Sequence, residues 1–105
     1  MSYYEEAKQK ILEYNPNVRF IVVTDDIDEA ASRFVGYDIV STSIAYDFSL
    51  LVQAQYLIIC NSTFSWWAAW LSNAIVIAPQ GFNHYNINRN VFSPADIKVD
   101  RFIWL

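Results

Sequence analysis

Short apolar runs alternate along the chain with longer segments in which apolar and polar residues are mixed. The runs are rich in β-branched and aromatic side chains, which is typical of strands covered on both faces of a parallel sheet. Pro79, which has no N–H group to offer a ladder, ends the last run. The expected strands are Phe20–Val23, Tyr37–Val40, Tyr56–Cys60 and Ala74–Ala78.

Segments with helical spacing precede and separate these runs. Asp28 and Glu29 suit the positively polarised first turn of a helix between the first two strands, and Gly36 closes that unit. Asp47 is expected to cap the next helix, and Asn61–Ser65 to open the one after it. Before the first strand, the apolar residues at helical spacing are Tyr4, Ala7, Ile11 and Leu12.

This alternation predicts an α/β fold. Parallel strands joined by helices need right-handed crossovers, so the expected architecture is a three-layer, Rossmann-like open sheet of about four parallel strands with flanking helices. Residues 1–105 are expected to form a single domain. After Gly81 the alternation stops. Phe82–Asn90 is expected to be a loop, Ser93–Asp96 to start a short helix, and Phe102–Leu105 to dock on the domain.

Ligands of open parallel sheets bind at the carboxyl ends of the strands. The chain has polar residues directly after each expected strand: Thr24–Asp26, Ser41–Asp47, Asn61–Ser65 and Pro79–Asn90. Candidate side chains are therefore expected to gather at one edge of the sheet.

The Asn61–Ser65 turn leads into a helix that carries Trp66, Trp67 and Trp70. Because the first N–H groups of a helix have no intrahelical partner, hydroxyl and amide side chains at this point predict an anion site for a phosphate. The alternative is that Ser62 or Thr63 only caps the helix. The helix is apolar nearly all round, which predicts that it is buried on both sides.

Five further residues each have two interpretations. Asp25 and Asp26 could bind a divalent metal, but with no third ligand at useful spacing a role in shaping the turn is favoured. Asp47 could accept hydrogen bonds from a base or ribose, or act only as a cap. For His84, a solvated surface position is favoured over a general base. For Cys60, within an apolar strand, a core position is favoured over reactivity.

Composition narrows the range of partners. Hydrophobic residues make up 54% of the chain and aromatic residues 17%, which excludes disorder and indicates apolar surface for a partner chain, a second copy or a missing domain. Eleven acidic against seven basic residues argue against nucleic-acid or anionic-membrane partners. A single cysteine, no signal peptide and no transmembrane run together predict a cytoplasmic protein.

Several stretches resemble a known family. Asp47–Leu51, Tyr56–Leu71 and Val76–Pro79 are similar to the C-terminal part of the α-1,2-fucosyltransferases. Val23–Asp26 resembles the Ser/Thr-Asp-Asp element found upstream in the same family. The Asn-Ser-Thr-Phe-Ser-Trp-Trp sequence within the second stretch is the most specific part of the resemblance.

The resemblance implies the donor half of a GT-B glycosyltransferase, which uses GDP-fucose and inverts configuration without a metal or other cofactor. Carried over by position, Asp47 would lie beside guanine, Ser62–Ser65 would line the diphosphate, and Asp25 and Asp26 would border the nucleotide pocket. An acceptor glycan would be bound through a missing domain or a partner chain. The nucleotide-binding residues expected are Asp25, Asp26, Asp47, Asn61, Ser62, Thr63, Phe64 and Ser65.

The sequence departs from the family pattern because the basic motif His-x-Arg-Arg-x-Asp and the N-terminal half of a GT-B enzyme are absent from it. No catalytic residue is therefore assigned, and the arginines are scattered. Three hypotheses follow. The chain is a donor half that transfers fucose only when a complementary basic half is supplied, a non-catalytic guanine-nucleotide or nucleotide-sugar binding module, or a relic that serves as an interaction domain. The arginines are Arg19, Arg33, Arg89 and Arg101.

Overall fold

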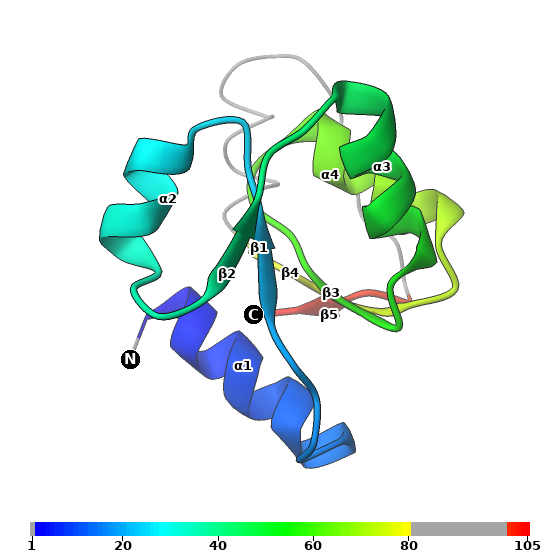
Figure 1. The fold of residues 1–105 in the computed structure, drawn as a ribbon. Coiled ribbons are helices and arrows are strands. Elements are labelled where there is room, and N and C mark those ends of the chain that lie inside the picture. The colour runs from blue at the N-terminus through cyan, green and yellow to red at the C-terminus, as the bar shows by residue number, and fades with distance from the viewer. Residues whose placement is uncertain (1, 81–100) are drawn as a thin grey trace.

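Helices and short strands alternate through residues 2–80 and 101–105, the part of the chain that the computed structural model describes (Figure 1). The predictions for Phe82–Asn90, Ser93–Asp96, His84 and Arg89 lie outside these residues. In chain order the elements are α1 (Tyr3–Tyr14), β1 (Ile21–Val23), α2 (Ile27–Arg33), β2 (Asp38–Val40), α3 (Ile44–Gln53), β3 (Tyr56–Ile58), α4 (Thr63–Leu71), β4 (Ile75–Ala78) and β5 (Ile103–Trp104).

All paired strands are parallel and both sheets are open, which confirms the predicted α/β class. The four expected strands form, but the ladders divide into a two-stranded sheet, β1–β2, and a three-stranded sheet, β3–β4–β5. The fifth strand comes from the apolar segment that was expected to dock. Its end is fixed to β4 by Leu105, whose N–H donates to Ala78 O at 2.9 Å and whose carbonyl accepts from Gln80 N at 2.8 Å.

The three-stranded sheet is covered on both faces. Because successive side chains of a strand point to opposite faces, Val76 faces α4 while Ile77 faces α1. On the first face the core includes Leu57, Ile59 and Trp66, and Leu51 of α3 packs against it. On the second face Ala7 and Ile11 of α1 are buried against Ile77. Figure 1 shows the resulting layers, with α1 on one side of the strands and α3 and α4 on the other.

Helix α1 also connects the two sheets. Tyr4 meets Phe34, which follows α2, edge to face at 5.2 Å, and Lys8 lies over the ring of Tyr37 before β2. The buried face of α1 differs from the predicted one, because Leu12 is exposed. Tyr3 takes its place, four residues before Ala7, and packs against the second core face.

Helix α4 is buried on one side only, so the prediction of burial on both sides is wrong. Trp66 faces the sheet and is 8% exposed, whereas Trp67 and Trp70 are 48% and 49% exposed. The sheet covers one face of α4 and α3 packs against another part of it, which leaves the side with Trp67 and Trp70 half exposed within the described residues. The buried ring of Trp66 stacks on Trp70 at 5.8 Å and meets Trp67 edge to face at 4.9 Å.

Candidate functional site

Three connections run from the carboxyl end of a strand into a helix, and each helix begins with a side-chain cap. A side-chain oxygen of each capping residue accepts a hydrogen bond from the backbone N–H three residues later, which satisfies one of the unpaired donors of the first turn. Asp26 caps α2, with its Oδ1 3.1 Å from Glu29 N. Ser43 caps α3, with its Oγ 3.1 Å from Tyr46 N. Ser62 caps α4, with its Oγ 3.4 Å from Ser65 N.

The turn before α4 is held by its own backbone and hydroxyl groups. Ser62 N–H donates to Cys60 O at 2.9 Å, and Ser65 Oγ donates to Ser62 O at 3.0 Å. Ser62 therefore is the cap, as one of the two interpretations held. The N–H groups of Thr63 and Phe64 have no hydrogen-bond partner within the described residues, and Thr63 is exposed. The structure thus leaves two donors at this helix start.

Asp47 is not the cap of α3, because the helix starts three residues earlier, at Ile44. Asp47 lies in the first turn, is 7% exposed, and its carboxylate accepts from the N–H of Thr42 at 3.2 Å and from its hydroxyl at 2.7 Å. A carboxylate in a first turn is favoured by the helix dipole. Asp47 therefore ties the strand-to-helix loop down, and its contact with a nucleotide stays a prediction.

Asp25 and Asp26 lie in the turn after β1, as predicted. Asp26 caps α2, and its N–H donates to Thr24 Oγ1 at 2.9 Å, so the interpretation as a turn-forming residue is confirmed for Asp26. Asp25 is exposed. Within residues 2–80 and 101–105 no three His, Cys, Asp or Glu side chains come together as a metal site would need.

Cys60 is exposed rather than part of the core, which corrects the prediction. Strand β3 ends at Ile58, and the hydrogen bond from Ser62 N to Cys60 O turns the chain out of the sheet. The Cys60 thiol consequently lies at the carboxyl edge, with its Sγ 3.9 Å from Ser65 Oγ.

Tyr3 is a residue of this edge that sequence reasoning missed. Its hydroxyl lies 2.6 Å from Ile59 O and 3.0 Å from Ile77 O, at the carboxyl ends of β3 and β4. Burial, with smaller contributions from Tyr4 and Cys60, raises the pKa of Tyr3 far above its ordinary value. The phenol therefore stays protonated and acts as a hydrogen-bond donor. The sequence did hold one signal for the burial of Tyr3, which is its spacing of four residues from Ala7 on the face of α1 that also carries Ile11.

The starts of the three helices that follow a strand differ in charge. The first turn of α2 contains Asp28 and Glu29 in addition to its aspartate cap, and the first turn of α3 contains Asp47. The first turn of α4 contains no acidic residue and its cap is a neutral serine. Since carboxylates repel an anion and compete for helix N–H groups, α4 is the helix start best suited to a phosphate.

The starts of α3 and α4 lie next to each other. The rings of Phe48 and Phe64 meet edge to face with their centroids 5.3 Å apart. The Ser41–Asp47 connection and the Asn61–Ser65 turn therefore border one region at the carboxyl edge. A ligand with a phosphate at α4 and a second polar group several ångströms away could contact both.

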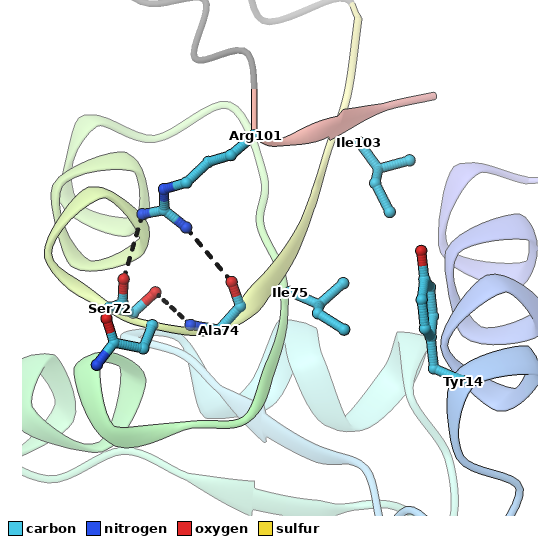
Figure 2. A pocket seen from close by; sticks show the side chains of 7 residues that line it. Tyr14, Ser72, Ala74, Ile75, Arg101 and Ile103 are labelled. Carbon is cyan, nitrogen blue, oxygen red and sulfur yellow. Dashed lines mark hydrogen bonds between the residues drawn. The ribbon is translucent and has the colours of Figure 1, made fainter.

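A pocket of about 380 Å³ lies at the opposite edge of the sheet, where β4 and β5 begin (Figure 2). Arg101 projects over it and donates to the carbonyls of Ala69, Trp70, Ser72 and Ala74 at 2.7–3.3 Å. Its guanidinium thereby satisfies the carbonyls at the end of α4. The pocket is lined by Tyr14, Ser72, Asn73, Ala74, Ile75, Arg101 and Ile103, none of which is a predicted site residue.

In the described ranges, no helix combines the length and the apolar character that crossing a bilayer requires.

Comparisons with known proteins agree with the resemblance noted in the sequence. The model of glycosyl transferase family 11 matches residues 1–100. The O-antigen biosynthesis glycosyltransferase WbnK of Escherichia coli is 36% identical over 90 residues, which cover 76% of this chain and 30% of that protein. An α-1,2-colitosyltransferase of Escherichia coli is 36% identical over 88 residues, covering 73% of this chain and 30% of that protein.

No solved structure matches the chain. The chain spans about 30% of the length of these two curated relatives. The family match confirms the resemblance to the α-1,2-fucosyltransferase family, because it covers nearly the whole sequence. The chain belongs to glycosyl transferase family 11.

Proposed function

We propose that the chain is the donor-binding part of a family 11 glycosyltransferase and binds GDP-fucose with its diphosphate at the start of α4. The observation that carries the proposal is the neutral, serine-capped first turn of α4, where the N–H groups of Thr63 and Phe64 have no partner in the described residues. Two N–H donors at the positive end of a helix, next to the hydroxyls of Ser62 and Thr63, suit a diphosphate.

The nucleoside would then extend toward the start of α3. Contact between Phe48 and Phe64 brings that helix start beside the diphosphate position. Asp47 is held by Thr42, and a carboxylate has more acceptor positions than these bonds occupy. In the proposal Asp47 orients the Ser41–Asp47 connection around guanine. Asp25 and Asp26 form the border of the nucleotide site at the carboxyl edge of the sheet.

Sugar transfer needs basic groups that the described residues do not place at this site. Arg19 precedes β1 and pairs with Asp38, Arg33 ends α2 and pairs with Glu29, and Arg101 holds the carboxyl end of α4. A helix N-terminus stabilises an anion by only about 0.3–1 kcal/mol. Enzymes lower barriers by at least about 8 kcal/mol. Transfer to an acceptor glycan is therefore proposed only in the presence of a complementary basic half.

A nucleotide comparison tests the proposal. The melting temperature of the chain is measured with GDP, UDP, ADP and GDP-fucose, and again for Asp47→Asn. GDP and GDP-fucose should raise the melting temperature most, and Asp47→Asn should reduce that rise. Equal shifts with all four nucleotides would contradict guanine recognition. No shift with any of them would favour an interaction domain instead.

A second measurement separates the donor half from a binding module without activity. The chain is mixed with a family 11 N-terminal half that carries the basic motif, and transfer from GDP-fucose is followed. GDP binding together with transfer supports the proposal. GDP binding without any transfer, when the supplied half is known to fold, favours a non-catalytic nucleotide-binding module.

A further inference from the structure

The ladder between β3 and β4 lacks one donor at its carboxyl end. These strands exchange hydrogen bonds at every second residue, from Ile75 N to Gln55 O at 3.0 Å and from Ile59 N to Ile77 O at 3.0 Å. The next bond in this alternation would run from the N–H of residue 79 to Ile59 O. Residue 79 is Pro79, which has no N–H group.

The Tyr3 hydroxyl takes the place of the missing N–H. Ile59 is 2% exposed, so its carbonyl needs a partner from within the protein. Tyr3 Oη lies 2.6 Å from Ile59 O and 3.0 Å from Ile77 O, and the shorter distance makes Ile59 its main acceptor. Burial raises the pKa of Tyr3, which keeps this donor protonated.

The carbonyl held by Tyr3 belongs to the peptide group that leads into the α4 turn. A peptide group is planar, so fixing Ile59 O also fixes the orientation of the Cys60 N–H and the direction of the chain beyond it. Cys60 O in turn accepts from Ser62 N at 2.9 Å and is 3.4 Å from Ser65 Oγ. The chain of bonds from Tyr3 therefore ends at the cap of α4.

We propose that Tyr3 is a positioning residue of the donor site, which sets the direction of the Asn61–Ser65 turn by supplying the hydrogen bond that Pro79 cannot. The effect of Tyr3 on GDP binding rests on the proposed function. The placement of the turn by Tyr3 is independent of any ligand. The two parts can therefore be tested separately.

The first experiment compares Tyr3→Phe with Tyr4→Phe in the full chain. The control removes a hydroxyl from the neighbouring residue of the same helix, and that hydroxyl bonds no carbonyl of β3 or β4 in the described part of the chain. Backbone amide NMR signals of Asn61, Ser62 and Thr63 report the turn, and GDP titration reports the site. Tyr3→Phe should move these signals and weaken GDP binding roughly three- to tenfold, the range that one neutral hydrogen bond spans. Tyr4→Phe should change neither.

The second experiment returns the missing donor by another route. Pro79→Ala gives residue 79 an N–H that points toward Ile59 O. The Tyr3→Phe/Pro79→Ala double variant should therefore recover the amide signals and the GDP affinity of Pro79→Ala alone. A purely structural loss of α1 packing would not be restored by a change in β4, so this rescue is specific to the proposed bond.

The outcomes separate the inference from the proposed function. Unchanged amide signals in Tyr3→Phe, or a loss that Pro79→Ala does not restore, overturn the role of Tyr3. If the unaltered chain binds no GDP, the proposed function fails and the amide signals alone decide whether Tyr3 sets the turn. If Tyr3→Phe does not fold, a folded double variant supports the inference and an unfolded one overturns it.

Discussion

The connections β1–α2 and β3–α4 share one topology but differ in charge and in burial. In the first, the helix start carries Asp26, Asp28 and Glu29, and the only buried residue of α2 is Ala30. In the second, the helix start carries hydroxyl groups, and Trp66, Ala68 and Ala69 are buried. A strand followed by a capped helix is therefore not enough to define an anion site. The charge of the first turn decides which connection suits a phosphate, and the core beneath it decides how firmly that turn is held.

The largest expected effect comes from removing core volume in the three-stranded sheet, to which β3 belongs. Ile77 of β4 is fully buried against Ala7 and Ile11 of α1, so Ile77→Ala should lower the free energy of unfolding by about 2–5 kcal/mol. Ile21 in β1 is 50% exposed, and Ile21→Ala, the matched control, should cost about 1 kcal/mol or less. Urea unfolding measures both. Equal losses would show that the two sheets contribute alike to stability.

The next effect comes from giving α4 the acidic start of α2. Thr63→Asp should weaken GDP binding at least about tenfold, because a carboxylate within a few ångströms of the diphosphate costs at least about 1.4 kcal/mol. Stability should hold or rise slightly, since an acid favours a helix N-terminus. Gln9→Glu, on the exposed face of α1, makes the same change of net charge as a control. GDP titration of both variants is decisive, and unaltered affinity in Thr63→Asp would remove α4 as the diphosphate site.

A smaller effect is expected at the helix caps, where the β1–α2 and β3–α4 connections should behave alike. Ser62→Ala and Asp26→Ala each delete one cap, and each should lower the free energy of unfolding by about 0.5–2 kcal/mol. Urea unfolding at neutral pH gives both values. A neutral effect in either variant would mean that the corresponding cap does not form in solution, and the comparison of the two helix starts would then need revision.

The smallest effect is a dependence of stability on alkaline pH. Tyr3 has a pKa raised above the ordinary value of 10.0, so the hydroxyl ionises in the unfolded chain before it does in the folded one. Its contribution to stability is complete well below pH 10 and is lost progressively as the pH rises, with a loss of about 0.4 kcal/mol at pH 10. Urea unfolding between pH 8 and 11 should show a shallower decline for Tyr3→Phe than for the unaltered chain. Parallel curves would indicate that the phenol is solvated.

Periodicity predicted the positions of the elements well because burial on both faces of a parallel strand leaves a direct signature in sequence. It could not give the exact helix starts. Ser43 and Asp47 are both acceptable caps one turn apart, and only the backbone geometry shows that Ser43 caps α3 while Asp47 binds Thr42. In the same way, the end of β3 depends on the bond from Ser62 N to Cys60 O, which an apolar run does not reveal.

Contacts between distant parts of the chain account for the remaining differences. Tyr3 meets Ile59 and Ile77, which are 56 and 74 residues away, so no local pattern could indicate this pairing. The half-exposed Trp67 and Trp70 depend on which face of α4 the sheet covers, and an all-apolar helix carries no signal for that choice. The candidate site was found because the carboxyl-end rule depends on topology alone, whereas its supporting contacts required coordinates.

The tryptophans of α4 give the site an optical reporter. Trp66 is held in ring contact with Trp67 at 4.9 Å and with Trp70 at 5.8 Å, and aromatic rings fixed in such packing contribute to the near-ultraviolet circular dichroism. The backbone N–H of Trp66 donates to the carbonyl of Ser62 at 3.0 Å. The three tryptophans are therefore linked to the residue that caps α4. A ligand that reorients the start of α4 should therefore change the dichroism of the unlabelled protein, and binding could be followed without a dye or an engineered chromophore.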